Sequence, residues 1–213
     1  MKGFLLGILL IIVVGVGGFV YRNAVEHPNR PIACPLDTLV CPDGTPVART
    51  GESCTFSACL PPNVSLADAG IAFAIPAGMS AAEIPDMASV AAYEHLTEAS
   101  TSARIIIRRY LIDASTTPLT VIQQTAINGT SGLPVGMTSF SSAVIGGRRF
   151  TVVSIERFES VVDTAYYLAH GSDILRFDAI DGGVAGWADA RLDTASLPAH
   201  AAISKLLSTL QVL

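Results

Sequence analysis

The sequence predicts an α+β fold in which an antiparallel β-sheet packs against helices, after a small cysteine-rich module and one apolar N-terminal helix. Three observations lead to this prediction. Residues 3–20 are uncharged and apolar, and all four cysteines lie within residues 34–59. Glycine-containing turns divide residues 138–180 into segments in which polar and apolar residues alternate. The predicted parts are, in order, a transmembrane anchor at 1–21, a stalk at 22–33, a disulfide-stapled module at 34–60 and an α+β domain at 61–213.

The apolar run at residues 3–20 is long enough for one membrane crossing. As a helix it would measure about 27 Å, close to the thickness of a bilayer's hydrocarbon core. The alternative is a cleaved secretory signal, because Lys2 forms a short positive start. Residues 19–24 contain no small-x-small cleavage site, however, and the first cysteine, Cys34, lies too far on for lipid attachment. These features favour an uncleaved anchor.

The four cysteines indicate disulfide bonds. They are separated by six, twelve and four residues, at Cys34, Cys41, Cys54 and Cys59. A zinc site is the alternative, but zinc-binding cysteine pairs favour two to four intervening residues, and no histidine lies within the module. Disulfides place the module in an oxidising compartment, so we expect the chain after the anchor to lie outside the cytoplasm. All three possible pairings stay open.

The module also has a recognisable pattern. It reads Cys-Pro-x-Asp-x-x-x-Cys-Pro-Asp-Gly from Cys34 and ends with Cys-x-Phe-x-x-Cys at Cys59. This pattern is similar to a short cysteine module that recurs in uncharacterised membrane-anchored bacterial proteins. The resemblance implies a cellular location and no chemistry. Asp43-Gly44 predicts a tight turn that leads into a short extended stretch up to Arg49.

The first half of the main domain contains strands and one helix. A short apolar strand is expected at residues 71–78, where Pro76 stops it. Residues 89–96 form a second apolar stretch that can pair with the next segment. That segment, 103–112, is rich in isoleucine and is predicted to be a strand. Residues 118–127 begin with a proline and place apolar residues at helical spacing.

The second half predicts a meander of four antiparallel strands. Glycines at 146–147 and the pair Gly171-Ser172 provide the tight turns of two hairpins. In the last strand Arg176 and Asp178 alternate with apolar residues, which predicts a sheet with one face in water. The predicted strands are 138–145, 148–157, 161–170 and 173–180.

A helix closes the chain. It is expected to begin near Pro198 with Ser196 as its cap, and its apolar stripe, which includes Ile203 and Leu207, should pack on the sheet. This order of elements resembles the PsbP-like family of extracytoplasmic α/β/α proteins. The resemblance implies an accessory or binding subunit. It rests on element order, and no family motif is present that would assign a role to any residue.

Composition excludes several classes of function. Beyond the anchor the chain keeps 12 of its 13 basic residues against 18 acidic ones, a balance of −6. Nucleic acid is therefore not expected as a partner. Lysine occurs only as Lys2 and Lys205, so motifs that need a catalytic or phosphate-binding lysine have almost no candidates. No cofactor is expected.

The sequence contains no convincing reaction centre. His170, Ser172 and Asp173 carry the residue types of a hydrolase, but they lie at a predicted hairpin tip and no Gly-x-Ser-x-Gly motif is present. No catalytic residue and no metal ligand is therefore assigned. A group of arginines could form an anion-binding patch, but is expected to protect strand edges; its members are Arg104, Arg108, Arg109, Arg148 and Arg149. A run of acids lacks the calcium-loop pattern; it consists of Asp173, Asp178, Asp181, Asp189 and Asp193.

The sequence thus predicts a single-pass cell-membrane protein with an extracytoplasmic binding or accessory domain. Its expected partners are the membrane, through the N-terminal helix, and another envelope protein or a small ligand. It is not expected to be an enzyme. Two alternatives remain: an envelope hydrolase that uses the region of His170, Ser172 and Asp173, and a protease-inhibitor-like role in which residues 43–49 form a rigid loop. No oligomeric state is predicted.

Overall fold

A computed structural model of the chain describes residues 7, 11–19, 21–22, 34–41, 46–51, 53–56, 59, 62–95 and 102–213. The chain forms two compact units: residues 1–38 with 48–57, and residues 39–47 with 58–213. Within the described residues, no helix is both long enough and apolar enough to cross a membrane. Of the predicted anchor, residues 1–6, 8–10 and 20 lie outside the described part.

The cysteine segment, residues 34–59, contains a small sheet and both disulfides. Its three strands lie in the order β1-β2-β3. Disulfides join Cys34 to Cys54 and Cys41 to Cys59, so the first cysteine pairs with the third and the second with the fourth. The prediction of disulfides is confirmed, and the structure selects one of the three possible pairings. The strands are β1 (Thr38–Val40), β2 (Pro46–Thr50) and β3 (Thr55–Phe56).

The main sheet has seven antiparallel strands in the order β6-β7-β8-β12-β11-β10-β9. The prediction of a four-stranded meander was therefore too small. The four predicted strands are present as β9 to β12, but the free edge of β12 pairs with β8 over ten residues, from Asp173 opposite Leu111 to Gly182 opposite Ser102. The strands are β6 (Met79–Ala81), β7 (Ser89–His95), β8 (Ser102–Leu111), β9 (Phe140–Ile145), β10 (Arg148–Phe158), β11 (Val161–His170) and β12 (Asp173–Gly182).

The turn between β9 and β10 needs glycine for two reasons. Gly146 and Gly147 both have positive φ, at 56° and 77°, a region that other residues rarely adopt. In addition, a Cβ atom on Gly146 would lie 2.8 Å from the carbonyl oxygen of Ser208. The turn therefore lies directly against the end of the C-terminal helix, which positions that helix over the sheet.

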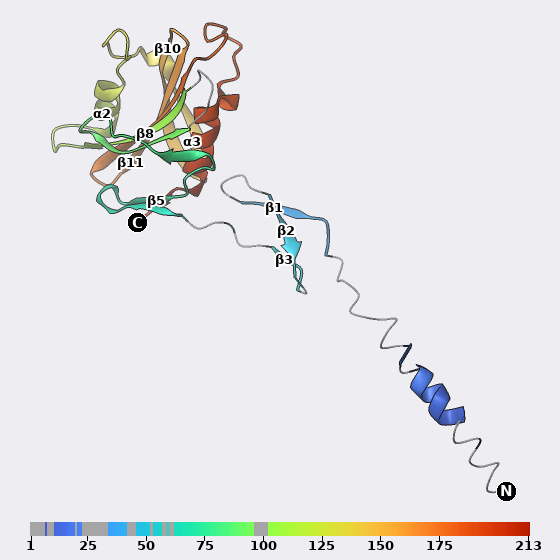
Figure 1. Cartoon of the computed structure of the whole chain (residues 1–213). Helices are drawn as coiled ribbons and strands as arrows, with labels where there is room; N and C mark the ends of the chain where they lie inside the picture. The colour runs from blue at the N-terminus through green and yellow to red at the C-terminus, as the bar shows by residue number, and fades with distance from the viewer. Residues whose placement is uncertain are drawn as a thin grey trace. The chain divides into compact units, whose positions relative to one another are not determined.

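Helices cover both faces of the main sheet. Helix α3 (Pro198–Thr209) packs on one face of the sheet (Figure 1). Its apolar stripe joins a core that includes Phe150 and Phe177. Helix α2 (Pro118–Thr125) packs on the other face, in a second core with Tyr167. The mixed α+β class is confirmed.

The prediction of a wet sheet face was wrong. Arg176 and Asp178 point to the α2 face, yet they are only 7% and 0% exposed. Polar and apolar residues do alternate in this part of β12. The polar side chains, however, are buried within the protein and form ion pairs instead of facing water.

Helix α3 begins at Pro198 as predicted, but Ser196 is not its cap. The Ser196 hydroxyl donates to the carbonyl oxygen of Asp193 instead. The helix start is held by Asp181, whose Oδ1 accepts the backbone N–H of Ala199 at 2.8 Å. A strand residue 18 positions earlier thus replaces the expected local cap.

Short elements complete the fold. The strand predicted at 71–78 ends before Pro76 and joins a separate sheet in the order β13-β5-β4. These strands are β4 (Val64–Leu66), β5 (Ile71–Phe73) and β13 (Gln211–Val212), and the 3-10 helices are η1 (Ala67–Ala69), η2 (Met137–Ser139) and η3 (Thr194–Ser196).

Candidate functional site

The three residues considered for hydrolysis lie at the β11–β12 turn but form no nucleophile–base pair. His170 is the cross-strand partner of Asp173, and Asp173 accepts from Arg109 Nε at 2.7 Å. Ser172 contributes its carbonyl oxygen, which accepts the N–H of Ile112. Among the described residues, no hydroxyl is hydrogen-bonded to the His170 ring, whose Nε2 lies close to the backbone of Gly70.

The arginines and aspartates of the sequence patterns do not gather into single patches. Arg104 and Arg108 point to the α2 face of β8, while Arg109 points to the α3 face. Each acid instead has partners of its own. Within the described residues, no group of three or more acids, histidines or cysteines could hold a metal ion. The acidic partners are Asp173 with Arg109, Asp178 with Arg108 and Arg176, Asp181 with His200, Asp189 with Arg191, and Asp193 with the start of η3.

The α2 face instead carries a chain of ion pairs, which we call the charge network: Asp86, Arg108, Asp178 and Arg176. Arg108 donates to Asp86 Oδ2 at 3.0 Å and also to Asp178. Asp178 accepts from Arg176 Nε at 2.6 Å on its other oxygen. Because Asp178 is fully buried, its two arginine partners replace all of the water that its charge would otherwise have. The network thus connects β8 and β12 at the centre of the sheet.

Arg176 also connects the sheet to α2. Its Nη1 donates to the carbonyl oxygen of Thr125, in the last turn of α2, at 2.5 Å. Its guanidinium lies 5.6 Å from the centre of the Tyr167 ring. Burial is the largest single influence and would lower the pKa of Arg176, but the charge and the hydrogen bond of Asp178, with smaller contributions from neighbouring groups, together raise the pKa. Burial raises the pKa of Tyr167 to about 12, so this ring stays a neutral phenol.

Asp163 on β11 is the unusual acid of this face. Its Oδ1 is buried and has no hydrogen-bond partner among the described residues. Burial has the largest effect on the pKa of Asp163 and raises it well above its ordinary value. The nearby negative charges of Asp178 and Glu156 also raise this pKa, while Arg176 and Arg108 act in the opposite direction. Asp163 therefore binds its proton more tightly in the folded protein than in the unfolded chain.

Asp163→Asn should make the protein more stable at neutral and alkaline pH. A carboxyl whose pKa is raised by folding loses stability as pH rises from the unfolded value, near 3.8, through the folded value. Asparagine has no charge to bury, so the gain should be on the order of 1 kcal/mol at high pH and absent below pH 3.8. Urea unfolding of the variant and the parent from pH 3 to pH 9 measures this difference.

Glu156→Gln is the matched control. Glu156 is the cross-strand neighbour of Asp163, but its carboxylate accepts from the backbone N–H and the hydroxyl of Thr130. This substitution should bring no gain that grows with pH. An Asp163→Asn variant that is less stable than the parent at every pH would show that Asp163 is ionised and well paired in the folded protein.

A second buried polar group joins α3 to two strands. His200 Nδ1 lies 2.6 Å from Asp181 Oδ2, and His200 Nε2 lies 2.9 Å from the Thr164 hydroxyl. His200 and Asp181 are both 2% exposed. Because Asp181 also holds the N–H of Ala199, the group fastens the first turn of α3 to β11 and β12. The imidazole ring of His200 is buried and both of its nitrogens have partners, which indicates a structural role.

Sequence reasoning missed this group and the charge network. No other histidine lies near His200 in sequence, so the local pattern does not mark it as part of a site. Its partners are 19 and 36 residues away, and Asp178 lies 70 residues from Arg108. A usable signal was the presence of four charged residues in one ten-residue strand whose other members are apolar or glycine: Asp173, Arg176, Asp178 and Asp181.

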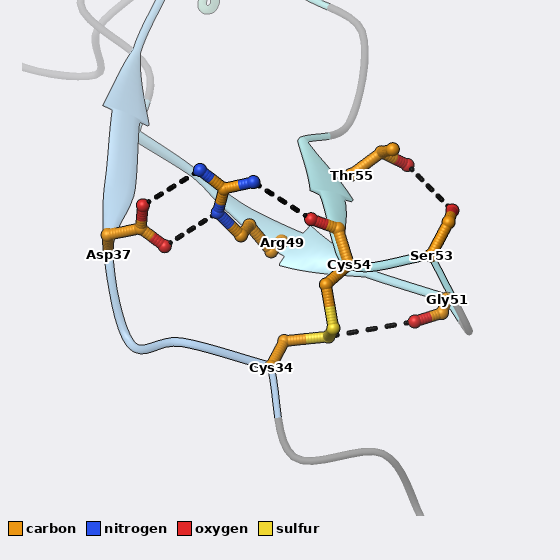
Figure 2. The surroundings of a disulfide bond; sticks show 7 residues. All are labelled: Cys34, Asp37, Arg49, Gly51, Ser53, Cys54 and Thr55. Atoms are coloured by element: carbon orange, nitrogen blue, oxygen red, sulfur yellow. Dashed lines mark hydrogen bonds and ion pairs between the residues drawn. A yellow bond between two sulfur atoms is a disulfide. The ribbon is translucent and has the colours of Figure 1, made fainter.

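The cysteine segment contains a pocket of about 440 Å³, lined by residues 34–38 and 48–51. The Cys34–Cys54 disulfide ties the first lining segment to the turn before β3 (Figure 2). Arg49 forms a bidentate ion pair with Asp37, with N–O distances of 2.8 and 3.0 Å. This pair links the lining segment 34–38 directly to the lining segment 48–51. Two cross-links therefore hold the pocket walls in place.

Arg49 is the central side chain of this pocket. It also donates to the carbonyl oxygen of Cys54 at 3.0 Å (Figure 2). Its guanidinium lies 4.1 Å from the centre of the Phe56 ring. The hydrogen bond from Arg49 lowers the pKa of Asp37, so the pair stays ionised down to acidic pH. Leu36, in contrast, lines the pocket with a fully exposed side chain.

The segment considered for protease inhibition is only partly described. Residues 42–45, with the predicted Asp43-Gly44 turn, lie outside the described residues. Residues 46–50 form β2, and Arg49 is held by Asp37 and Phe56 rather than projecting as a free loop residue.

Comparisons with known proteins assign no family. No family model matches the chain, and no curated protein matches it either. Among solved structures, a crystal structure from Bacteroides thetaiotaomicron is similar over 68% of this chain and 45% of its own length, with a TM-score of 0.43 and 13% sequence identity. This chain therefore spans less than half of that protein.

Proposed function

We propose that this chain is an extracytoplasmic binding or accessory protein, tethered to the membrane by its apolar N-terminal run, whose cysteine segment contacts an envelope protein. The cross-linked pocket of residues 34–38 and 48–51 carries the proposal. Its volume is in the range of small ligand sites, and its walls are set before any partner arrives. Such preorganisation lowers the entropy cost of binding.

The side chains of the pocket suit a partner with mixed chemistry. Leu36 offers fully exposed apolar surface, while Asp37 and Arg49 are 49% and 32% exposed. Exposed apolar surface next to a fixed ion pair is typical of protein contacts, where arginine is enriched. Two disulfides support an oxidising location. The PsbP-like resemblance belongs to the same proposal, and a sheet with a helix on each face is the layering that it implies.

The hydrolase alternative has less support. A hydrolase needs a hydroxyl or thiol beside a base, and His170 has no hydrogen bond to such a group among the described residues. It is tested by ester turnover of the purified full chain. Turnover that disappears in Ser172→Ala would favour the alternative over the binding proposal.

Photocrosslinking at Leu36 tests the proposed contact. A photoreactive phenylalanine at position 36 of the full chain, expressed in its own cells, should give a defined adduct with one envelope protein after irradiation. The same amino acid at Leu133, which is 65% exposed in the other unit, is the matched control and should give at least about tenfold less of that adduct. Mass spectrometry identifies the partner.

Two results would count against the proposal. Equal yields from positions 36 and 133 would indicate random collision, and no adduct at position 36 would mean that the pocket faces no partner. Asp37→Asn gives a finer readout. It should weaken the adduct at position 36, because it releases the wall that Arg49 holds, without affecting expression of the chain.

A further inference from the structure

The two edges of the seven-stranded sheet differ in how they are protected. One edge strand, β6, has only three residues, and prolines lie on either side of it at 76 and 85. Short edge strands and nearby prolines prevent a sheet from adding further strands. The other edge strand, β9, has six residues, Phe-Ser-Ser-Ala-Val-Ile, without charge, proline or glycine. It therefore lacks the usual protection.

The outer side of β9 is also open. Within the described part of the chain, β10 is its only strand neighbour. Ser141, Ser142 and Val144 are exposed, with Val144 at 65%. A strand in this state presents unpaired backbone N–H and C=O groups to any extended segment that fits.

The order of side chains along β9 suits a second copy of the same strand. Phe140 pairs with Val153 of β10 in the α2-side core, so Phe140, Ser142 and Val144 all point to the α2 face. A two-fold axis through Ser142 would place Phe140 opposite the partner's Val144 and the partner's Phe140 opposite Val144. Ring and β-branched pairs of this kind stabilise antiparallel strands, and no like charges would meet.

We propose that β9 pairs antiparallel with β9 of a second copy, with Ser142 at the two-fold axis, so that the two main sheets become one continuous sheet. This register keeps both α2 faces on the same side, because opposite residues of paired strands point the same way. It also covers both exposed edges at once, as expected of a closed two-fold contact. The pairing is independent of the contact proposed for the cysteine segment.

A cysteine at the axis tests this register. Ser142→Cys, in the purified full chain with a mild detergent, should form a disulfide-linked dimer under copper-phenanthroline oxidation, because directly opposite residues have Cβ atoms about 5 Å apart. All four native cysteines are already paired, so the new thiol is alone. Non-reducing gels over time give the rate.

Val144→Cys is the matched control. It lies on the same strand and face, but its own copy would be four residues away along the partner strand, roughly 13 Å. Ser142→Cys should therefore cross-link roughly tenfold faster or more. Association through the apolar N-terminal run would give the two variants equal rates. That result, or no cross-linking of Ser142→Cys, would overturn the proposal.

A substitution that keeps the chain free of new thiols provides the second measurement. Ser142→Lys would bring two ammonium groups together at the axis, while Ala81→Lys places the same charge on the β6 edge. Light scattering after size exclusion should show a dimer for the parent and Ala81→Lys and a monomer for Ser142→Lys. A parent that is monomeric at all concentrations, or a β9 cross-link in cells to a different protein, would contradict pairing with a second copy.

Discussion

Asp178→Asn should lower the free energy of unfolding by about 3–5 kcal/mol, the largest effect that we expect of a single substitution. Asparagine keeps the shape of the side chain but removes its charge. Arg176, which is 7% exposed, and Arg108 would then face each other across β12 and β8 without their common anion. Chemical unfolding followed by circular dichroism gives the change.

A matched pair of variants separates charge from geometry in this result. Asp189→Asn also removes an aspartate that pairs with an arginine, but Arg191 is 92% exposed there and no measurable change is expected. The double variant Arg108→Met with Asp178→Asn should lose less stability than the two single changes added together, since it leaves one buried cation fewer without a partner. Strict additivity, or a loss below about 1 kcal/mol for Asp178→Asn alone, would argue against the network as a source of stability.

Removing the Cys34–Cys54 disulfide should unfold the cysteine segment locally. The bond closes a loop with a sequence separation of 20 residues, for which chain entropy predicts roughly 3 kcal/mol. A segment this small has little core of its own to compensate. In the variant Cys34→Ser with Cys54→Ser, trypsin should cleave after Arg49 about 100-fold faster, because Arg49 is then no longer held against Asp37 and Phe56. Mass spectrometry of timed digests measures the rate.

The digest contains its own control. Arg191 lies in the main unit with a highly exposed side chain, and the rate of cleavage there should stay the same in both proteins. Asp37→Asn, which removes the ion pair but keeps both disulfides, should speed cleavage after Arg49 only slightly. If the double cysteine variant were cut no faster than the parent, the Cys34–Cys54 bond would not be what orders this segment.

Local patterns predicted the elements of the main domain well. Glycines at 146–147 and 171 mark turns whose positive φ angles the structure shows, and Pro118 and Pro198 each begin a helix. These features depend on backbone preferences within a few residues, so the sequence displays them directly. The observed bounds of β11 are those expected, and the bounds of β10 and β12 differ from the expected ones by one and two residues.

The candidate sites were less accessible to sequence reasoning. Asp178 was expected on a sheet face in water, and nothing near Asp181 or His200 in sequence reveals a partner for either residue. Their burial arises only when α2 and α3 cover the two faces of the sheet. The pocket of the cysteine segment was also not predicted, because it needs the pairing of Cys34 with Cys54.

The sequence alone determined where the longer strands and the two helices of the main domain lie, and that the cysteines would be joined in pairs. Those properties follow from residue type, residue spacing and short-range periodicity. The tertiary structure decided the seven-strand order, the disulfide pairing, and the use of Asp178 and Asp181 to hold elements 18 to 70 residues away. The physical reason is that long-range contacts depend on which surfaces are complementary and which charged groups are buried next to each other. These arrangements exist only after the sheet has formed.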